Sequence, residues 1–194
     1  MEFRTPVHIA PFGFRIGHSH KGLLVGSCFA DRIGRIMRNH KLPVTVNPFG
    51  TLFNPASIAA TLKRLEEHRS YDAGDLTRYE ERWISFDHHG AFDGSDCKQT
   101  LRRINEALET GAEALRTADY AILTLGTAWV YELRDTGRIV ANCHKLPESV
   151  FRRRRLTPEE IVRLWEKPLS TYLEDKEVIF TVSPVRHLRD GLAE

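Results

Sequence analysis

The sequence has little cysteine and lacks long apolar runs. Its 194 residues include three cysteines, Cys28, Cys97 and Cys143. An odd and sparse set of this kind does not form a disulfide framework, so we expect a reducing, cytoplasmic compartment. The longest apolar runs, 23–25 and 120–123, are far too short to span a bilayer. The N-terminus shows no basic region followed by an apolar stretch, so no signal peptide is visible.

A strong charge of one sign is also absent. The chain carries 28 Lys and Arg against 26 Asp and Glu, a formal net charge of +2. A dedicated nucleic-acid binder would need a domain-wide basic excess, so this class is excluded. Hydrophobic residues make up 41% and charged residues 28%, as in a soluble globular domain and unlike a disordered chain. We expect a single domain over residues 1–194, and nothing in the sequence indicates a cofactor.

Apolar strands alternate with amphipathic helices along the chain. Short apolar runs indicate buried strands, and apolar residues three or four apart indicate helices. The expected strands are 22–26, 43–46, 120–125 and 177–182, with a peripheral strand at 83–86 and a hairpin of 129–133 and 138–141. The expected helices are 29–40, one opened by Asn54-Pro55, 98–116, and one opened by Thr157-Pro158. This order predicts an α/β fold with a doubly wound, mostly parallel sheet.

The most polar residues follow directly after the four main strands. They are 26–28, 47–50, 126–129 and 183–187. In parallel sheets, ligands bind beyond the carboxyl ends of the strands. Four strand ends that each carry a nucleophile, glycines or a histidine therefore predict a site at this edge.

Ser27 and Cys28 are the candidate nucleophiles, because both lie on the turn between the first strand and the first helix. Gly26 allows a tight turn there. The N-terminus of a helix stabilises an anion, and its backbone N–H groups can hold an oxyanion. The alternative is structural: Ser27 caps the helix and Cys28 is a small buried hydrophobic residue. The turn alone leaves both interpretations open.

Five segments form a recognisable combination. Residues 26–30 read Gly-Ser-Cys-Phe-Ala, and they are accompanied by 47–50 with Asn54-Pro55, by 124–131, by 142–145 and by 181–187. Together they resemble the GSCFA family, whose name spells the first segment. That family is similar to a branch of the SGNH, or GDSL-type, hydrolase superfamily. The resemblance implies a flavodoxin-like, three-layer α/β/α domain that hydrolyses acyl esters, often on carbohydrates or lipids.

The resemblance also implies roles by position. Aligned on Gly26, Cys28 takes the place of the superfamily's nucleophile and Ser27 takes that of the Asp before it. The nucleophile is then Cys28, or Ser27 by a shift of one residue, or absent. Gly50 matches the glycine of the second block, which would donate its N–H to the oxyanion.

The later blocks match only in part. Gly126 and Thr127 match the start of the third block, but Ala128 and Trp129 replace its Asn-Asp, which removes one side-chain oxyanion donor. The last block, Asp-x-x-His, does not occur among the final residues. We therefore expect the C-terminal part of the domain, with its catalytic His and Asp, to be missing.

Several polar residues near the strand ends are binding candidates. His187 is a candidate general base, and a histidine that only orders its loop is the alternative. Arg186 beside it could bind a carboxylate or phosphate. Asn47 and His144 are expected beside the pocket, and Trp129 could stack on a sugar ring.

Two further features carry no function in this interpretation. Neither His18-Ser19-His20 nor His88-His89 has the spacing of a zinc site, so no metal is expected. The basic run 152–155 is interpreted as a solvated linker.

The leading hypothesis is hydrolysis of an acyl ester on a small molecule or a carbohydrate. Ser27 or Cys28 would attack the acyl carbon, and the N–H after the nucleophile and that of Gly50 would stabilise the oxyanion. A second hypothesis is a catalytically inactive binding domain with the SGNH fold. A third is a thiol-dependent enzyme that uses Cys28.

Overall fold

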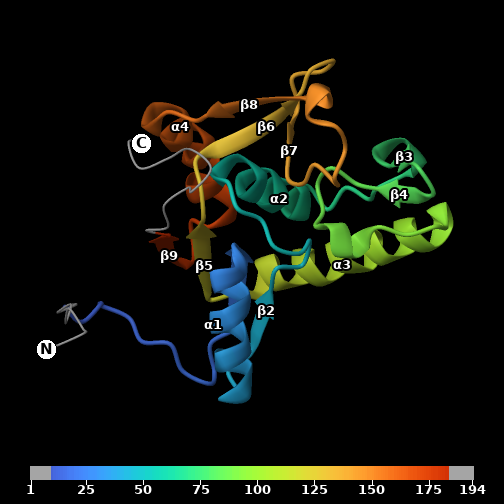
Figure 1. Ribbon diagram of the computed structural model, residues 1–194. Helices are drawn as coiled ribbons and strands as arrows, with labels where there is room; N and C mark the ends of the chain where they lie inside the picture. The colour runs from blue at the N-terminus through green and yellow to red at the C-terminus, as the bar shows by residue number, and fades with distance from the viewer. Residues whose placement is uncertain (1–9, 184–194) are drawn as a thin grey trace, which may run out of the picture.

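A four-stranded parallel sheet forms the centre of the computed structural model, which describes residues 10–183 (Figure 1). Its strands are β1 (Gly22–Gly26), β2 (Val44–Val46), β5 (Tyr120–Leu125) and β9 (Glu177–Val182), in the order β2-β1-β5-β9. Every residue of β1 is buried, as is β5 up to its last residue. Strands covered on both faces need apolar residues at nearly every position, which explains why these two segments are continuous apolar runs.

Helices cover both faces of this sheet, so the fold has three layers, α/β/α, as predicted. α1 (Cys28–Asn39) covers one face, where Met37 shares a core cluster with Leu24 and Ile122. The opposite face carries α2 (Pro55–Glu67), α3 (Cys97–Thr117) and α4 (Pro158–Lys167), whose apolar residues pack with Leu23 and Leu123.

Within residues 10–183, α1 is the single helix on its face of the sheet, and the strand order explains this. The chain moves outward from β1 to β2, and then back past β1 to β5 and on to β9. Right-handed crossovers in opposite directions place their helices on opposite faces of the sheet. The order is that of the first four strands of a flavodoxin-like sheet.

Each long helix begins at a side chain that accepts an N–H group of its first turn. The N-caps are Ser27 for α1, Asn54 for α2, Asp96 for α3 and Thr157 for α4. In α4 the N-cap and Glu160 exchange reciprocal bonds and form a capping box. Proline stands at the start of α2 and α4, where its missing N–H needs no partner. The predicted starts at Asn54 and Thr157 are thus confirmed.

A separate antiparallel sheet packs on α2, where Ala56 shares a core cluster with Val130. Its central strand is β6 (Trp129–Leu133), which pairs with β7 (Ile139–Val140) and β8 (Phe151–Arg155). The predicted hairpin is confirmed as β6 and β7. The interpretation of 152–155 as a solvated linker is wrong, because these arginines form β8.

The arginines of β8 suit a strand because alternate side chains have partners on opposite sides. Arg154 donates from Nε to Glu132 at 2.6 Å and from Nη1 to Glu160 at 2.8 Å. The guanidinium of Arg153 lies 3.6 Å from the centroid of the Trp129 ring. The run is therefore an ion-paired edge strand that also contacts α4.

The remaining elements are short. A two-stranded ribbon consists of β3 (Thr77–Tyr79) and β4 (Arg82–Ile84), and β4 matches the predicted peripheral strand. The single-turn helices are η1 (Ala73–Asp75), η2 (Gly90–Phe92), η3 (Glu148–Val150) and the π-helical η4 (Pro168–Tyr172).

We expect Gly34→Ala to destabilise the fold, because Gly34 is the point where α1 contacts β2. A Cβ at this position would overlap Val46 Cγ2 and lie 3.0 Å from Val46 Cγ1. Better helix propensity would offset about 1 kcal/mol, while overpacking costs typically about 1–3 kcal/mol. Urea unfolding should show a net loss in the free energy of unfolding. Gly13→Ala is the control, since a Cβ there meets nothing within 4 Å. Equal losses in the two variants would contradict the close contact.

Candidate functional site

The carboxyl ends of β1 and β2 are joined by the side chain of Asn47. Its Oδ1 accepts the N–H of Gly26 at 2.8 Å, and its Nδ2 donates to Asp31 Oδ1 at 2.7 Å. Asn47 has a φ of 45°, a left-handed conformation in which Asn is enriched. The Asn47 side chain therefore fixes the turn after β1 relative to the first turn of α1.

Ser27 is buried, with 3% of its surface exposed. Its N–H donates to Thr124 Oγ1 at 2.7 Å, and its own Oγ lies 3.1 Å from the same oxygen. The Oγ also accepts the N–H of Phe29 at 3.3 Å. Ser27 therefore ties β1 to β5 and caps α1, and its hydroxyl faces the protein interior.

Gly26 is required at this turn by its backbone conformation. Its φ is 143°, a region that residues with a side chain rarely adopt. A Cβ there would also overlap the carbonyl oxygen of Thr124. The close approach of β1 to β5 at this point is what brings Ser27 to Thr124.

Cys28, in contrast, is exposed at the first position of α1. It lines a shallow hollow of about 740 Å³ between the ends of the strands and α1, together with Val46 and Ser183. Of the two candidate nucleophiles, Cys28 is the one that a substrate can reach.

The charged lining of the hollow is mostly basic, while Phe29 and Val46 supply apolar surface. Arg32, Arg35 and Arg38 line it, and they lie one, two and three turns along α1 from Cys28. Within residues 10–183 none of the three forms an ion pair. The acidic residue of the hollow, Asp31, accepts from Asn47. The hollow therefore presents a surplus of positive charge.

The structure brings Gly126 beside Ser27, but its N–H is already used. A Cβ on Gly126 would lie 3.4 Å from Ser27 Cβ. The N–H groups of Gly126 and Thr127 both donate to the carbonyl oxygen of Phe53, at 2.8 and 3.0 Å. The N–H of Gly50 donates to the Asn47 carbonyl at 2.8 Å. In this structure these amides hold loops together instead of facing the hollow.

Trp129 does not line the hollow of Cys28. It begins β6, and the Arg153 guanidinium covers its ring. The second guanidinium, from Arg155, lies 5.9 Å from the same centroid. The ring is therefore engaged in cation–π contacts within the protein.

His144 lies in a separate buried cluster. Its Nε2 is 2.8 Å from the backbone carbonyl of Ser85, and its Nδ1 is 2.9 Å from Asp93 Oδ1, although the latter pair is not aligned as a hydrogen bond. Its neighbour Cys143 is half-buried, and burial raises the pKa of that thiol to about 11. A thiol of this kind is protonated at neutral pH, so the adjacent Cys and His form no catalytic pair.

His88 occupies the same cluster and is fully buried. Its Nδ1 lies 2.8 Å from Ser85 Oγ, and its ring contacts the rings of Phe49, Tyr71 and Phe92. Burial lowers the pKa of His88 to about 3. The imidazole is therefore neutral and belongs to the core.

His187 and Arg186 lie outside the described residues, so their predicted roles stay predictions.

The sequence did not single out Asp31 and Thr124 as residues of the site. Thr124 did give a signal, because it is the single polar residue in the apolar strand 120–125.

One comparison with known proteins identifies the family. The model of the GSCFA family matches residues 21–194. This chain belongs to the GSCFA family. The searches of curated proteins and of solved structures gave no match for this GSCFA chain.

The described part of this GSCFA chain, residues 10–183, contains neither a membrane-crossing helix nor a metal-binding cluster. None of the helices within residues 10–183 combines the length and hydropathy that a membrane crossing needs. The same part of the chain has no group of three or more His, Cys, Asp and Glu side chains placed to hold a metal ion.

Acid should destabilise this GSCFA chain through His88. The unfolded histidine titrates near 6.5 and the folded one at about 3, so between these values the unfolded state binds more protons and stability falls as the pH falls. For one such group the loss from pH 8 to pH 5 is about 2 kcal/mol. In urea unfolding His88→Phe should be less pH-dependent by that amount, whereas the exposed His40→Gln should match the parent. An unchanged slope in His88→Phe would contradict the assignment.

Proposed function

We propose that this GSCFA chain is a thiol-dependent hydrolase of acyl esters, related in fold and site to the SGNH hydrolases, with Cys28 as its nucleophile. The exposure of Cys28 on a basic hollow, beside a buried Ser27, is the observation that carries the proposal. Of the two residues that the sequence left open, only Cys28 can meet a substrate without rearrangement of the turn. The family match and the three-layer fold support the same placement.

The position at the start of α1 suits a nucleophile. The first N–H groups of a helix have no acceptor within the helix, and they favour negative charge near them. Both a thiolate and the oxyanion of a tetrahedral intermediate carry such charge. Gly50 and Gly126 use their amides internally, and the N–H groups of Phe29 and Ala30 donate to Ser27. In this proposal the N–H of Cys28 itself is therefore the oxyanion donor of the first turn of α1.

Hydrolysis takes place in two acyl transfers, first to Cys28 and then to water. Cys28 Sγ attacks the acyl carbon, the ester C–O bond breaks, and the alcohol leaves with the proton that the thiol gave up. Water then attacks the thioester, which releases the carboxylic acid and restores the thiol. We assign the transient proton to His187, the base proposed from the sequence. Ser27 is a positioning residue, since it holds the turn through Thr124.

The arginines of the hollow point to the substrate class. An arginine fork binds carboxylate or phosphate oxygens in a bidentate manner. Arg32 and Arg35 lie roughly 6 and 10 Å along the helix axis from Cys28, at 1.5 Å per residue. An ester whose negatively charged group lies roughly 6 to 10 Å from its acyl carbon therefore fits the hollow.

Cys28→Ala and Cys28→Ser should abolish multiple-turnover hydrolysis of p-nitrophenyl acetate. Ser27→Ala should retain it where the variant is folded, at a cost of about 1 kcal/mol for the lost cap. Iodoacetamide labelling followed by peptide mapping should modify Cys28 ahead of Cys143. Cys97→Ser is the matched control, because it removes a cysteine outside the hollow and should leave hydrolysis unchanged. Full turnover in Cys28→Ala, or labelling of Ser27 by a fluorophosphonate, would overturn the assignment.

The double change Arg32→Ala/Arg35→Ala should separate charged from neutral substrates. For an ester that carries a carboxylate, such as the p-nitrophenyl monoester of succinate, we expect KM to rise about tenfold, because charge-assisted hydrogen bonds are lost. For p-nitrophenyl acetate KM should hardly change. Arg163→Ala, on α4, controls for the loss of a surface charge. Equal effects on both esters would contradict the role of these arginines.

A specific observation favours a second candidate function. The amides of Gly50 and Gly126 are engaged, and Ala128-Trp129 replaces the Asn-Asp of the superfamily. A chain with this arrangement could bind an anionic ester without cleaving it. Retention of charged esters without turnover, in a chain whose Cys28 is not acylated, would favour this function.

A further inference from the structure

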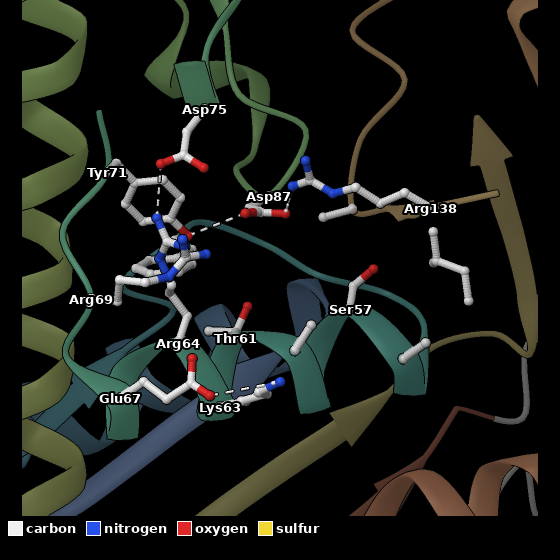
Figure 2. A pocket seen from close by; sticks show the side chains of 15 residues that line it. Ser57, Thr61, Lys63, Arg64, Glu67, Arg69, Tyr71, Asp75, Asp87 and Arg138 are labelled. Atoms are coloured by element: carbon white, nitrogen blue, oxygen red, sulfur yellow. Dashed lines mark hydrogen bonds and ion pairs between the residues drawn. The ribbon is translucent and has the colours of Figure 1, made fainter. Parts of the chain in front are cut away.

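A second pocket lies over α2, on the side of the sheet that α1 does not cover. It has a volume of about 390 Å³, within the range of small-molecule sites. One face of α2 forms its floor, and Figure 2 shows the hydroxyls of Ser57 and Thr61 pointing into it. In the same view Arg64 and Arg69 lie on one side and Arg138 on the other. Because α1 and α2 cover opposite faces of the sheet, this pocket is separate from the hollow of Cys28.

Each carboxylate of the pocket already has a cation as its partner. Asp75 Oδ2 accepts from Arg64 Nη2 at 3.0 Å, and Asp87 pairs with Arg138. The carboxylate of Glu67 lies 3.6 Å from Lys63 Nζ. These pairs compensate the negative charge of the pocket, so a ligand with positive charge gains little there.

Tyr71 connects two of the pairs and keeps them in place. Its hydroxyl donates to Asp87 Oδ2 at 3.3 Å, and the Arg64 guanidinium lies 3.7 Å from its ring centroid. Burial and the neighbouring Asp87 raise the pKa of Tyr71, so its hydroxyl stays a donor. Arg64 itself is only 7% exposed. The side of the wall formed by Arg64 and Tyr71 is therefore a fixed network, whereas the Arg138 side chain on the other side is 44% exposed.

Three groups that can donate hydrogen bonds lack acceptors among the described residues. Within residues 10–183, Arg69 forms no hydrogen bond or ion pair, although it lines the pocket. Thr61 is 3% exposed, and no described residue accepts from its hydroxyl. Arg64 Nε is buried without an acceptor among the same residues. Donors that lack acceptors favour a ligand rich in anionic oxygens.

We infer that this pocket binds a small molecule through a compact oxyanion, a carboxylate or a phosphate. Arg69 and Thr61 bind the oxyanion directly, and Arg64 behind them adds positive charge. A single oxyanion fills only part of the volume, so the rest of the ligand lies toward Ser57 and Ile139. The site requires no chemistry at Cys28.

Isothermal titration of the full chain carrying Arg32→Ala/Arg35→Ala, which removes two arginines of the Cys28 hollow, tests the site with three probes at one ionic strength: inorganic phosphate, succinate and magnesium chloride. We expect phosphate or succinate to bind with one-to-one stoichiometry, and the stronger of the two identifies the oxyanion. Magnesium should give no heat beyond dilution, because the carboxylates are already paired. Binding of magnesium alone, or of no probe at millimolar concentration, would overturn the proposal.

Variants test which residues hold the oxyanion. Arg69→Ala should weaken binding about tenfold, and Thr61→Val should weaken it several-fold. Arg78→Ala removes an exposed arginine of β3 outside the pocket and should leave the affinity unchanged. Equal losses in Arg69→Ala and Arg78→Ala would show nonspecific attraction and overturn the site. All of these variants carry Arg32→Ala/Arg35→Ala as background, so the result is independent of anion binding in the hollow of Cys28 and of the outcome for hydrolysis.

Discussion

The hydrogen bonds of one buried side chain hold the turn after β1 in place. Asn47 accepts from Gly26 and donates to Asp31, so it joins β1, the end of β2 and α1 at a single point. Ser27 completes the junction by bonding Thr124 of β5. Because these bonds fix the direction in which α1 leaves the sheet, they also decide that Ser27 is covered and Cys28 is exposed. The exposure of the candidate nucleophile, Cys28, thus depends on these buried hydrogen bonds.

The two faces of the sheet offer different chemistry. On the α1 face, three arginines without ion pairs in residues 10–183 follow an exposed cysteine along the helix in a shallow hollow. On the α2 face, paired charges and a buried tyrosine form the walls of a smaller pocket. Both surfaces have hydrogen-bond donors that lack acceptors among residues 10–183, and both suit ligands with negative charge. An ester hydrolase with an anionic substrate and a separate oxyanion site is consistent with this arrangement.

The sequence predicted the parallel sheet well, because buried strands such as 120–125 are apolar on both faces. It predicted helix starts at Asn54 and Thr157, since capping depends on neighbouring residues only. It failed at 152–155, where arginine acts as a strand residue only because Trp129 and Glu132 lie on the adjacent strand. The burial of His88 and His144 depends on loops far apart in the chain, so no local pattern indicated it. The turn motif located Ser27 and Cys28. Only the structure, in which Ser27 bonds to Thr124, shows that Ser27 is buried and Cys28 is exposed.

The edge strand β8 has a consequence for the way copies of the chain meet. Edge strands expose unpaired N–H and C=O groups, which can join another sheet. Here that edge carries four consecutive arginines, with Arg152 and Arg155 exposed. A second β8 laid against it would bring like charges side by side, and such pairs are destabilising. The three-stranded sheet is thereby protected from growing into a continuous intermolecular sheet along this edge, and this protection weakens as added salt screens the charges.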